Sequence, residues 1–134
     1  MSEKILARAS GADRVSVGEV VTAKVDLVMS HDNAALIGTI FKGIPVRTVF
    51  DSARMVVTLD HRSPAPDIET ASKAKLVRAF VKEQGIRDFY DIKAGICHQV
   101  LPEQGHILPD MHSVRPDSHP GTQAAWGAPR HATT

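Results

Sequence analysis

Short apolar runs alternate with longer amphipathic segments along the chain. Apolar and β-branched residues concentrate at Val20–Met29, Met55–Leu59 and Met111–Val114, and we interpret these three segments as strands. The run Met55–Leu59 is nearly continuous, which is typical of a strand that is covered on both faces. Two shorter apolar pieces, Val46–Phe50 and Phe89-Tyr90, lie between them. The chain is therefore expected to contain a buried sheet.

The clearest helix prediction covers Ile68–Gln84. Asp67 is a good N-cap residue, and Gly85 suits the position just past the last turn. The apolar positions of this segment fall on one stripe, formed by Ala74, Val77, Phe80 and Val81. An apolar stripe of this kind packs against another element, so we expect the helix to cover the sheet.

Two shorter helices are expected nearer the N-terminus. Ser2–Ala9 has an apolar edge and ends at Ser10-Gly11. Ala34–Phe41 is small and apolar, and Ser30 or Asp32 could cap it. Because strands and helices alternate along the chain, an α/β layered domain is the expected fold class.

The last part of the chain differs from the rest. Pro120–Thr134 is rich in Ala, Gly, Pro and Thr and lacks apolar periodicity. We expect this tail to be divergent and loosely ordered, so that residues 1–119 form the domain. Within the domain, Ala12–Gly18 is predicted to be a polar link, with turns at Lys42–Pro45 and Pro102–Gly105.

Composition narrows the possible functions. The 134 residues suit one domain, and the 43% hydrophobic and 23% charged residues are ordinary for a globular protein. A net charge of +1 gives no electrostatic reason to expect nucleic acid or an anionic membrane as a partner. The sequence has no apolar run of about 18 residues and no secretory signal, so no membrane helix is expected. A single cysteine excludes an internal disulfide and favours a reducing cytoplasm.

The pair Asp60-His61 directly follows the predicted strand Met55–Leu59. In open α/β sheets, ligands bind beyond the carboxyl ends of the strands. A carboxylate can fix one imidazole nitrogen so that the other handles a proton, which makes this pair a candidate acid–base unit. A turn in which Asp60 acts only as a cap is the alternative.

Two other positions could join this pair. His98, within Gly95–Leu101, is either a pocket residue or a core histidine, and its neighbour Cys97 is expected to be a small buried hydrophobe. Asp32 could hydrogen-bond a hydroxy acid or cap the helix that follows it.

Asp117-Ser118-His119 combines a carboxylate, a hydroxyl and an imidazole. Adjacent residues cannot form a hydrolase relay, and the chain has no Gly-x-Ser-x-Gly elbow. The segment is either part of a pocket or an Asx-turn at a strand end. Pro120 directs the backbone of His119 toward an extended conformation.

Seven histidines raise the question of zinc. Zinc sites favour closely spaced ligand pairs on one element. His106 and His112 are six residues apart and Pro109 lies between them. No metal ligands are therefore predicted, and a small zinc-dependent lyase stays an alternative.

Four segments together carry a family resemblance: Gly95–Glu103, Asp60-His61, Asp117-Ser118-His119 and the opening Ser2–Arg8. Their order and spacing resemble the large subunits of 3-isopropylmalate dehydratases in the aconitase superfamily. The resemblance implies a partial, truncated three-layer α/β/α domain of aconitase type. It also implies a hydro-lyase of leucine biosynthesis, which isomerises a hydroxy-dicarboxylate by dehydration and rehydration.

The same resemblance implies roles for particular residues. The Asp-His pair would help to protonate the departing hydroxyl, and the imidazole of His98 would line the pocket. The implied catalytic residues are Asp60, His61, His98, Asp117 and His119, and the implied substrate contacts are Asp32 and Ser118. These roles require His61, His98 and His119 to meet at the carboxyl edge of the sheet.

Proteins of this kind hold a [4Fe-4S] cluster through cysteines that this chain lacks, and they work with a small subunit. We therefore expect the chain to be a truncated or frame-shifted piece that is inactive alone. The alternative from another class is a non-catalytic module that binds a dicarboxylate or docks on a partner subunit.

Overall fold

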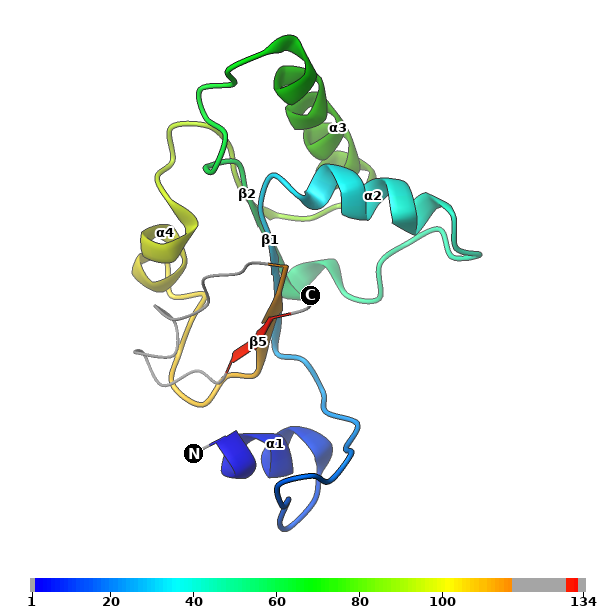
Figure 1. The fold of residues 1–134 in the computed structure, drawn as a ribbon, viewed down its shortest axis with the longest axis vertical. Coiled ribbons are helices and arrows are strands. Elements are labelled where there is room, and N and C mark those ends of the chain that lie inside the picture. Colours follow the sequence, from blue (N-terminus) through cyan, green and yellow to red (C-terminus); the bar gives the residue numbers. More distant parts are fainter. Residues whose placement is uncertain (1, 117–129, 133–134) are drawn as a thin grey trace.

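A five-stranded parallel sheet forms the centre of the protein (Figure 1). The computed structural model describes residues 2–116 and 130–132. The sheet order is β3-β2-β1-β4-β5. The strands are β1 (Leu27–Ser30), β2 (Met55–Thr58), β3 (Asp88–Tyr90), β4 (Ser113–Arg115) and β5 (Arg130–Ala132). Because every pairing is parallel, the carboxyl ends of these strands lie at one edge of the sheet.

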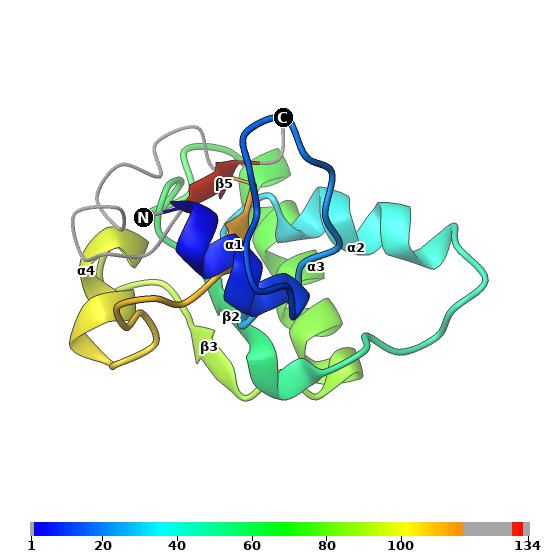
Figure 2. The ribbon, with the colours of Figure 1, turned by 90° about the horizontal axis from the view of Figure 1, so that it is seen from below.

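Helices cover both faces of this sheet, as the view in Figure 2 shows. Helices α2 and α3 lie on one face and α4 lies on the other, while α1 lies at the amino ends of the strands. The helices are α1 (Ser2–Ser10), α2 (Ala34–Lys42), α3 (Ile68–Gln84) and α4 (Cys97–Glu103), with a 3-10 turn at Ser52–Arg54. Among the described residues, no helix has both the length and the apolar character needed to cross a bilayer.

Two apolar clusters lie between the layers, one on each face of the sheet. Val57 packs with α2 and α3, whereas its neighbour Val56 packs with α4, and both side chains are 0% exposed. Successive residues of a strand point to opposite faces, so the unbroken apolar run of β2 supplies both clusters. The predicted three-layer α/β/α arrangement is therefore confirmed.

Helix α3 forms as its sequence predicts. The Asp67 side chain accepts a hydrogen bond from the Thr70 backbone N–H at 2.7 Å, and Gly85 adopts a φ of 64° past the last turn. On the facing helix, a Cβ at Gly38 would lie 3.1 Å from the Phe80 ring. The small residue at position 38 therefore allows α2 and α3 to approach closely.

Three predictions of local structure are wrong. A strand was expected at Val20–Met29, but β1 begins only at Leu27, and the Val20 side chain is 98% exposed. The strands that pair with β1 are short, with four residues in β2 and three in β4, so the segment before Leu27 has no neighbouring strand to pair with. Neither Ser30 nor Asp32 caps α2; its N-cap is Asn33, which makes no side-chain cap bond. The turn expected from Pro102 begins later, because α4 includes this proline and ends at Glu103.

The expected tail is described only in part. Residues 130–132 form β5, which pairs with β4 along the sheet edge, although a loosely ordered segment was expected there. Residues 117–129 and 133–134 lie outside the described part of the chain. The boundary at residue 119 therefore stays a prediction.

Candidate active site

Two acid–histidine pairs lie side by side where β1 and β2 end. His31-Asp32 follows β1 directly, and Asp60-His61 follows β2 after one further residue. The two strands are parallel neighbours, with Ser30 opposite Val57. Helix α4 begins at Cys97 on one face of the sheet, and its first turn joins this group. The fold thus brings together side chains from three distant segments.

Asp60 is the hub of this group. One carboxylate oxygen, Oδ1, accepts hydrogen bonds from His61 Nδ1 at 3.0 Å and from the Thr58 hydroxyl at 3.1 Å. The other, Oδ2, accepts the backbone N–H of Cys97 at 2.6 Å. The Asp60 side chain is only 3% exposed. This one carboxylate therefore joins the end of β2 to the start of α4.

The pKa of Asp60 lies below its ordinary value of 3.8. Burial alone would raise this pKa, but hydrogen bonds from the Cys97 backbone, the His61 ring and the Cys97 thiol outweigh burial. Asp60 is therefore ionised at neutral pH. An ionised carboxylate only accepts hydrogen bonds, so His61 carries a hydrogen on Nδ1 and leaves Nε2 for exchange with a substrate.

Asp32 fixes the loop that carries this pair. Its Oδ2 accepts the backbone N–H of His61 at 2.9 Å and that of Asp60 at 3.4 Å. A carboxylate that accepts two successive backbone N–H groups holds the turn in one conformation. Asp32 thus positions the acid–base pair, in addition to any contact with a substrate.

The imidazole ring of His61 has two other imidazole rings near it, those of His31 and His98. The rings of His31 and His61 are stacked with centroids 4.2 Å apart, and the centroid of His98 lies 6.3 Å from that of His61. Nε2 of His31 also lies 3.1 Å from the carbonyl oxygen of Pro116, directly after β4. The His31 ring therefore connects the ends of β1, β2 and β4.

Of the three histidines that were expected to meet, the structure places His61 and His98 near one another. Asp32 and Asp60 belong to the same group. The third segment, Asp117-Ser118-His119, lies outside the described residues, and its expected approach to the group stays a prediction. His31 was not selected from the sequence. Its position directly after a strand was the signal that could have identified it.

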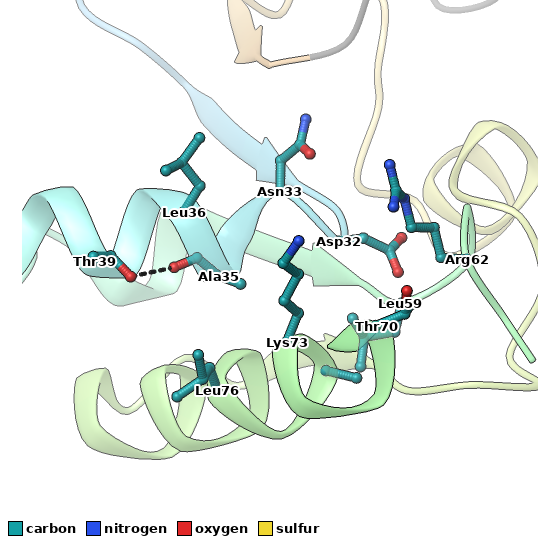
Figure 3. Close-up of a pocket in the computed structure, with 11 residues that line it drawn as sticks. Asp32, Asn33, Ala35, Leu36, Thr39, Leu59, Arg62, Thr70, Lys73 and Leu76 are labelled. Atoms are coloured by element: carbon teal, nitrogen blue, oxygen red, sulfur yellow. Dashed lines mark hydrogen bonds between the residues drawn. The ribbon is translucent and has the colours of Figure 1, made fainter. Parts of the chain in front are cut away.

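A hollow of about 330 Å³ adjoins this group between α2 and α3, as Figure 3 shows. Its polar part includes Asp32, Thr70, Lys73 and the exposed Arg62, and its apolar part includes Leu36, Leu59 and Leu76. Sequence reasoning missed Arg62 and Lys73, because neither belongs to a recognisable motif. A wider hollow of about 450 Å³ lies near Asp60, between the residues that follow β2 and those that precede α4.

A parallel sheet with helices on both faces and carboxylate–histidine pairs at its carboxyl edge defines an α/β domain equipped for acid–base chemistry. The chain belongs to the Aconitase family (aconitate hydratase), which matches residues 5–129.

Named relatives refine this assignment. A protein of Methanothermobacter thermautotrophicus named "Probable 3-isopropylmalate dehydratase large subunit" is 50% identical over 129 residues, which cover 96% of this chain and 31% of the relative. The 3-isopropylmalate dehydratase large subunit of Aquifex aeolicus is 44% identical, with 96% and 30% covered. A probable methanogen homoaconitase large subunit of M. thermautotrophicus is 45% identical, with 96% and 31% covered. The chain thus spans about a third of the length of the relatives it matches.

The family implies a [4Fe-4S] cluster, and the donors in this chain do not fit one. Such clusters are held by several cysteine thiolates. This sequence has one cysteine, Cys97, and its side chain is 0% exposed. The thiol also makes a hydrogen bond to the Asp60 carboxylate. The proton transfers open to this chain therefore depend on its own carboxylates and imidazoles.

Proposed function

We propose that this chain forms the histidine–carboxylate wall of a hydro-lyase active site, within an enzyme that isomerises a hydroxy-dicarboxylate by dehydration and rehydration. The observation that supports this most directly is the Asp60–His61 contact of 3.0 Å, held in place by Asp32 and by the start of α4. The named relatives are dehydratase and homoaconitase large subunits, which agrees with this class of reaction.

In dehydration, His61 would supply the proton for the leaving hydroxyl. The hydroxyl takes the Nε2 proton of the doubly protonated His61 ring and departs as water with the electrons of the C–O bond, while a base removes a proton from the adjacent carbon. The electron pair of that C–H bond then forms the double bond. Rehydration reverses these transfers. Asp60 keeps the ring in one orientation, which a proton donor requires if it is to reach one particular oxygen.

His98 would complete the proton-handling wall beside His61, since the centroids of the two rings lie 6.3 Å apart. Asp117 and His119 are proposed to bracket the same pocket, and Ser118 is proposed to contact a substrate carboxylate. These three roles depend on the family resemblance of Asp117-Ser118-His119. The carbon base is proposed to come from a small subunit, because the relatives are named as large subunits.

The basic side chains beside Asp32 are suited to an anionic substrate. Arg62 follows His61 in the chain, and Lys73 projects into the hollow from α3 (Figure 3). Both are exposed, so they would attract a dicarboxylate toward the edge of the sheet before it binds. We propose 3-isopropylmalate or a closely related hydroxy acid as the substrate.

The test is to add the part of a named relative that this chain does not match. The 134-residue chain would be combined with the remaining segment of the M. thermautotrophicus dehydratase large subunit and the matching small subunit, reconstituted with iron and sulfide. Formation of the unsaturated acid from 3-isopropylmalate is expected with the wild-type chain. His61→Gln should abolish it, whereas the control His106→Gln should retain it.

Equal turnover with wild type and His61→Gln would refute the role of this ring. The chain incubated alone with iron, sulfide and 3-isopropylmalate is expected to show no turnover. Turnover well above a no-protein control would refute the proposal that the chain supplies only part of the site.

A second candidate is a non-catalytic dicarboxylate-binding module, which the hollow beside Arg62 and Lys73 favours. Calorimetry with 3-isopropylmalate and citrate separates the two functions. Binding to the chain combined with no turnover in the reconstituted mixture would support the module. Turnover in that mixture that is lost in His61→Gln would exclude it.

A further inference from the structure

A compact set of nitrogen and sulfur donors lies at the start of α4. Each of His61, Cys97 and His98 offers one potential ligand atom, and these atoms all lie within 4.8 Å of one another. The Cys97 side chain is 0% exposed, that of His61 is 38% exposed, and His98 is half-buried. The set is therefore open to solvent on the His61 side and closed on the Cys97 side.

This donor set has the composition that zinc prefers. Zinc binds thiolate and imidazole in tetrahedral sites, with Zn–S near 2.3 Å and Zn–N near 2.0–2.1 Å. In a tetrahedral site, such bond lengths place two nitrogen ligands about 3.3 Å apart and a nitrogen and a sulfur about 3.6 Å apart. Atoms within 4.8 Å of one another therefore need to approach by at most about 1.5 Å to share one ion. A hard cation such as magnesium prefers oxygen donors and octahedral geometry instead.

Asp60 supplies the support that a zinc-binding histidine usually has. Ligand histidines commonly donate their second N–H to a carboxylate, which fixes the tautomer and the ring orientation. Here the Nδ1–H of His61 points to Asp60, whose Oδ2 also holds the backbone of Cys97 at 2.6 Å. One carboxylate thus organises two of the three donors before any metal arrives.

A neighbouring set, formed by His31, Asp32 and His61, is also within reach of one ion. Its oxygen donor is already committed, because Oδ2 of Asp32 accepts two backbone N–H groups. Nε2 of His31 is engaged with the Pro116 carbonyl. The Cys97 thiol also has a partner, Asp60, but a thiolate suits a borderline cation better than a carboxylate does, so the set that contains Cys97 is the better site.

We propose that the chain binds one zinc ion, or another borderline divalent cation, through His61 Nε2, the Cys97 thiolate and one His98 ring nitrogen, with a fourth position left to water. Binding replaces the thiol proton of Cys97, which passes to the buffer, so one proton is released for each ion bound. The ion would occupy the nitrogen that the proposed dehydratase chemistry needs. The binding itself rests on the donor geometry and not on that function.

Cobalt(II) titration of the full 134-residue chain tests the site, because cobalt replaces zinc in tetrahedral sites and is coloured. One equivalent is expected to give a sulfur-to-cobalt charge-transfer band in the near ultraviolet and strong tetrahedral bands in the visible. Zinc should bleach both. Cys97→Ser should remove the charge-transfer band, and His61→Gln should weaken binding by more than about tenfold. The control His106→Gln should match wild type.

Circular dichroism of each variant establishes whether it is folded. If Cys97→Ser does not fold, His61→Gln decides the outcome, because that side chain is partly exposed. A folded wild-type chain with no charge-transfer band would overturn the proposal. Unchanged affinity in folded His61→Gln, or an equal loss in His106→Gln, would overturn it as well. None of these readouts depends on dehydratase activity.

Discussion

Replacing Asp60 with asparagine tests the hub of the site while keeping its shape. The carboxylate accepts hydrogen bonds from His61, from Thr58 and from both the backbone N–H and the thiol of Cys97. An amide has one accepting and one donating end. The Cys97 N–H can only donate, so the amide oxygen must face it and the NH₂ group must face His61. In Asp60→Asn, Nδ1 of His61 therefore has to accept, and its hydrogen moves to Nε2.

The change in stability follows from the same contacts. A hydrogen bond to an ionised group contributes about 1.5–3 kcal/mol, against about 0.5–1.5 kcal/mol for a neutral one. The Asp60 side chain is 3% exposed, so solvent screens its bonds little, but the His61 ring is 38% exposed. We expect Asp60→Asn to lower the free energy of unfolding by about 1–3 kcal/mol.

The pH dependence of this difference has a definite sign. The native pKa of Asp60 is below 3.8, so its contribution is fully present above that value and is lost as pH falls through the native pKa. Asparagine has no such contribution. The gap in stability between wild type and Asp60→Asn should therefore be constant at neutral pH and narrow below about pH 4.

Two measurements check these expectations. Urea unfolding followed by circular dichroism gives the stability of each protein, with Asp13→Asn as a control for a surface carboxylate. Long-range ¹H–¹⁵N spectra at a pH where an imidazole is ordinarily neutral give the His61 tautomer. The same tautomer in both proteins, or equal stability at neutral pH, would refute the reasoning about Asp60.

Two further predictions concern the packing and a surface ion pair. Leu101→Ala should lower the free energy of unfolding by about 2–5 kcal/mol in urea titrations, since this fully buried side chain joins α4 to the sheet; a loss below about 1 kcal/mol would contradict that packing. Arg78→Met should destabilise by less than about 1 kcal/mol in low salt and by nothing measurable in 1 M salt, because the Arg78 and Asp91 side chains are 39% and 43% exposed. Arg78 also lowers the pKa of Asp91, so NMR titration should show that pKa rise in the variant.

The parts of the fold that local chemistry determines could be predicted from the sequence. Helix α3 has the predicted bounds, with Asp67 and Gly85 at its ends, because its caps lie within a few residues of the helix. The run Met55–Leu59 identified β2 because a strand covered on both faces needs apolar residues at successive positions. The segment at Val20–Met29 was overestimated, because strand length depends on partner strands that local sequence does not reveal.

The site residues also divide into those that local sequence identifies and those that only the fold reveals. Asp60 and His61 were identified because they follow a recognisable strand, and the resemblance of Gly95–Glu103 to a known family identified His98. The contact of His31 with both the His61 ring and the Pro116 carbonyl could not be foreseen. It joins residues 85 positions apart in the chain, and only the sheet order β2-β1-β4 brings them together.

The stacked ring of His31 has a consequence for control of the site. Its face lies against the ring of His61, and its Nε2 contacts the carbonyl of Pro116, the residue at which the chain leaves β4. A displacement of the Pro116 carbonyl would therefore act on His31 and, through the stacked rings, on His61, so a substitution at Pro116 would reach the proposed proton donor without touching it.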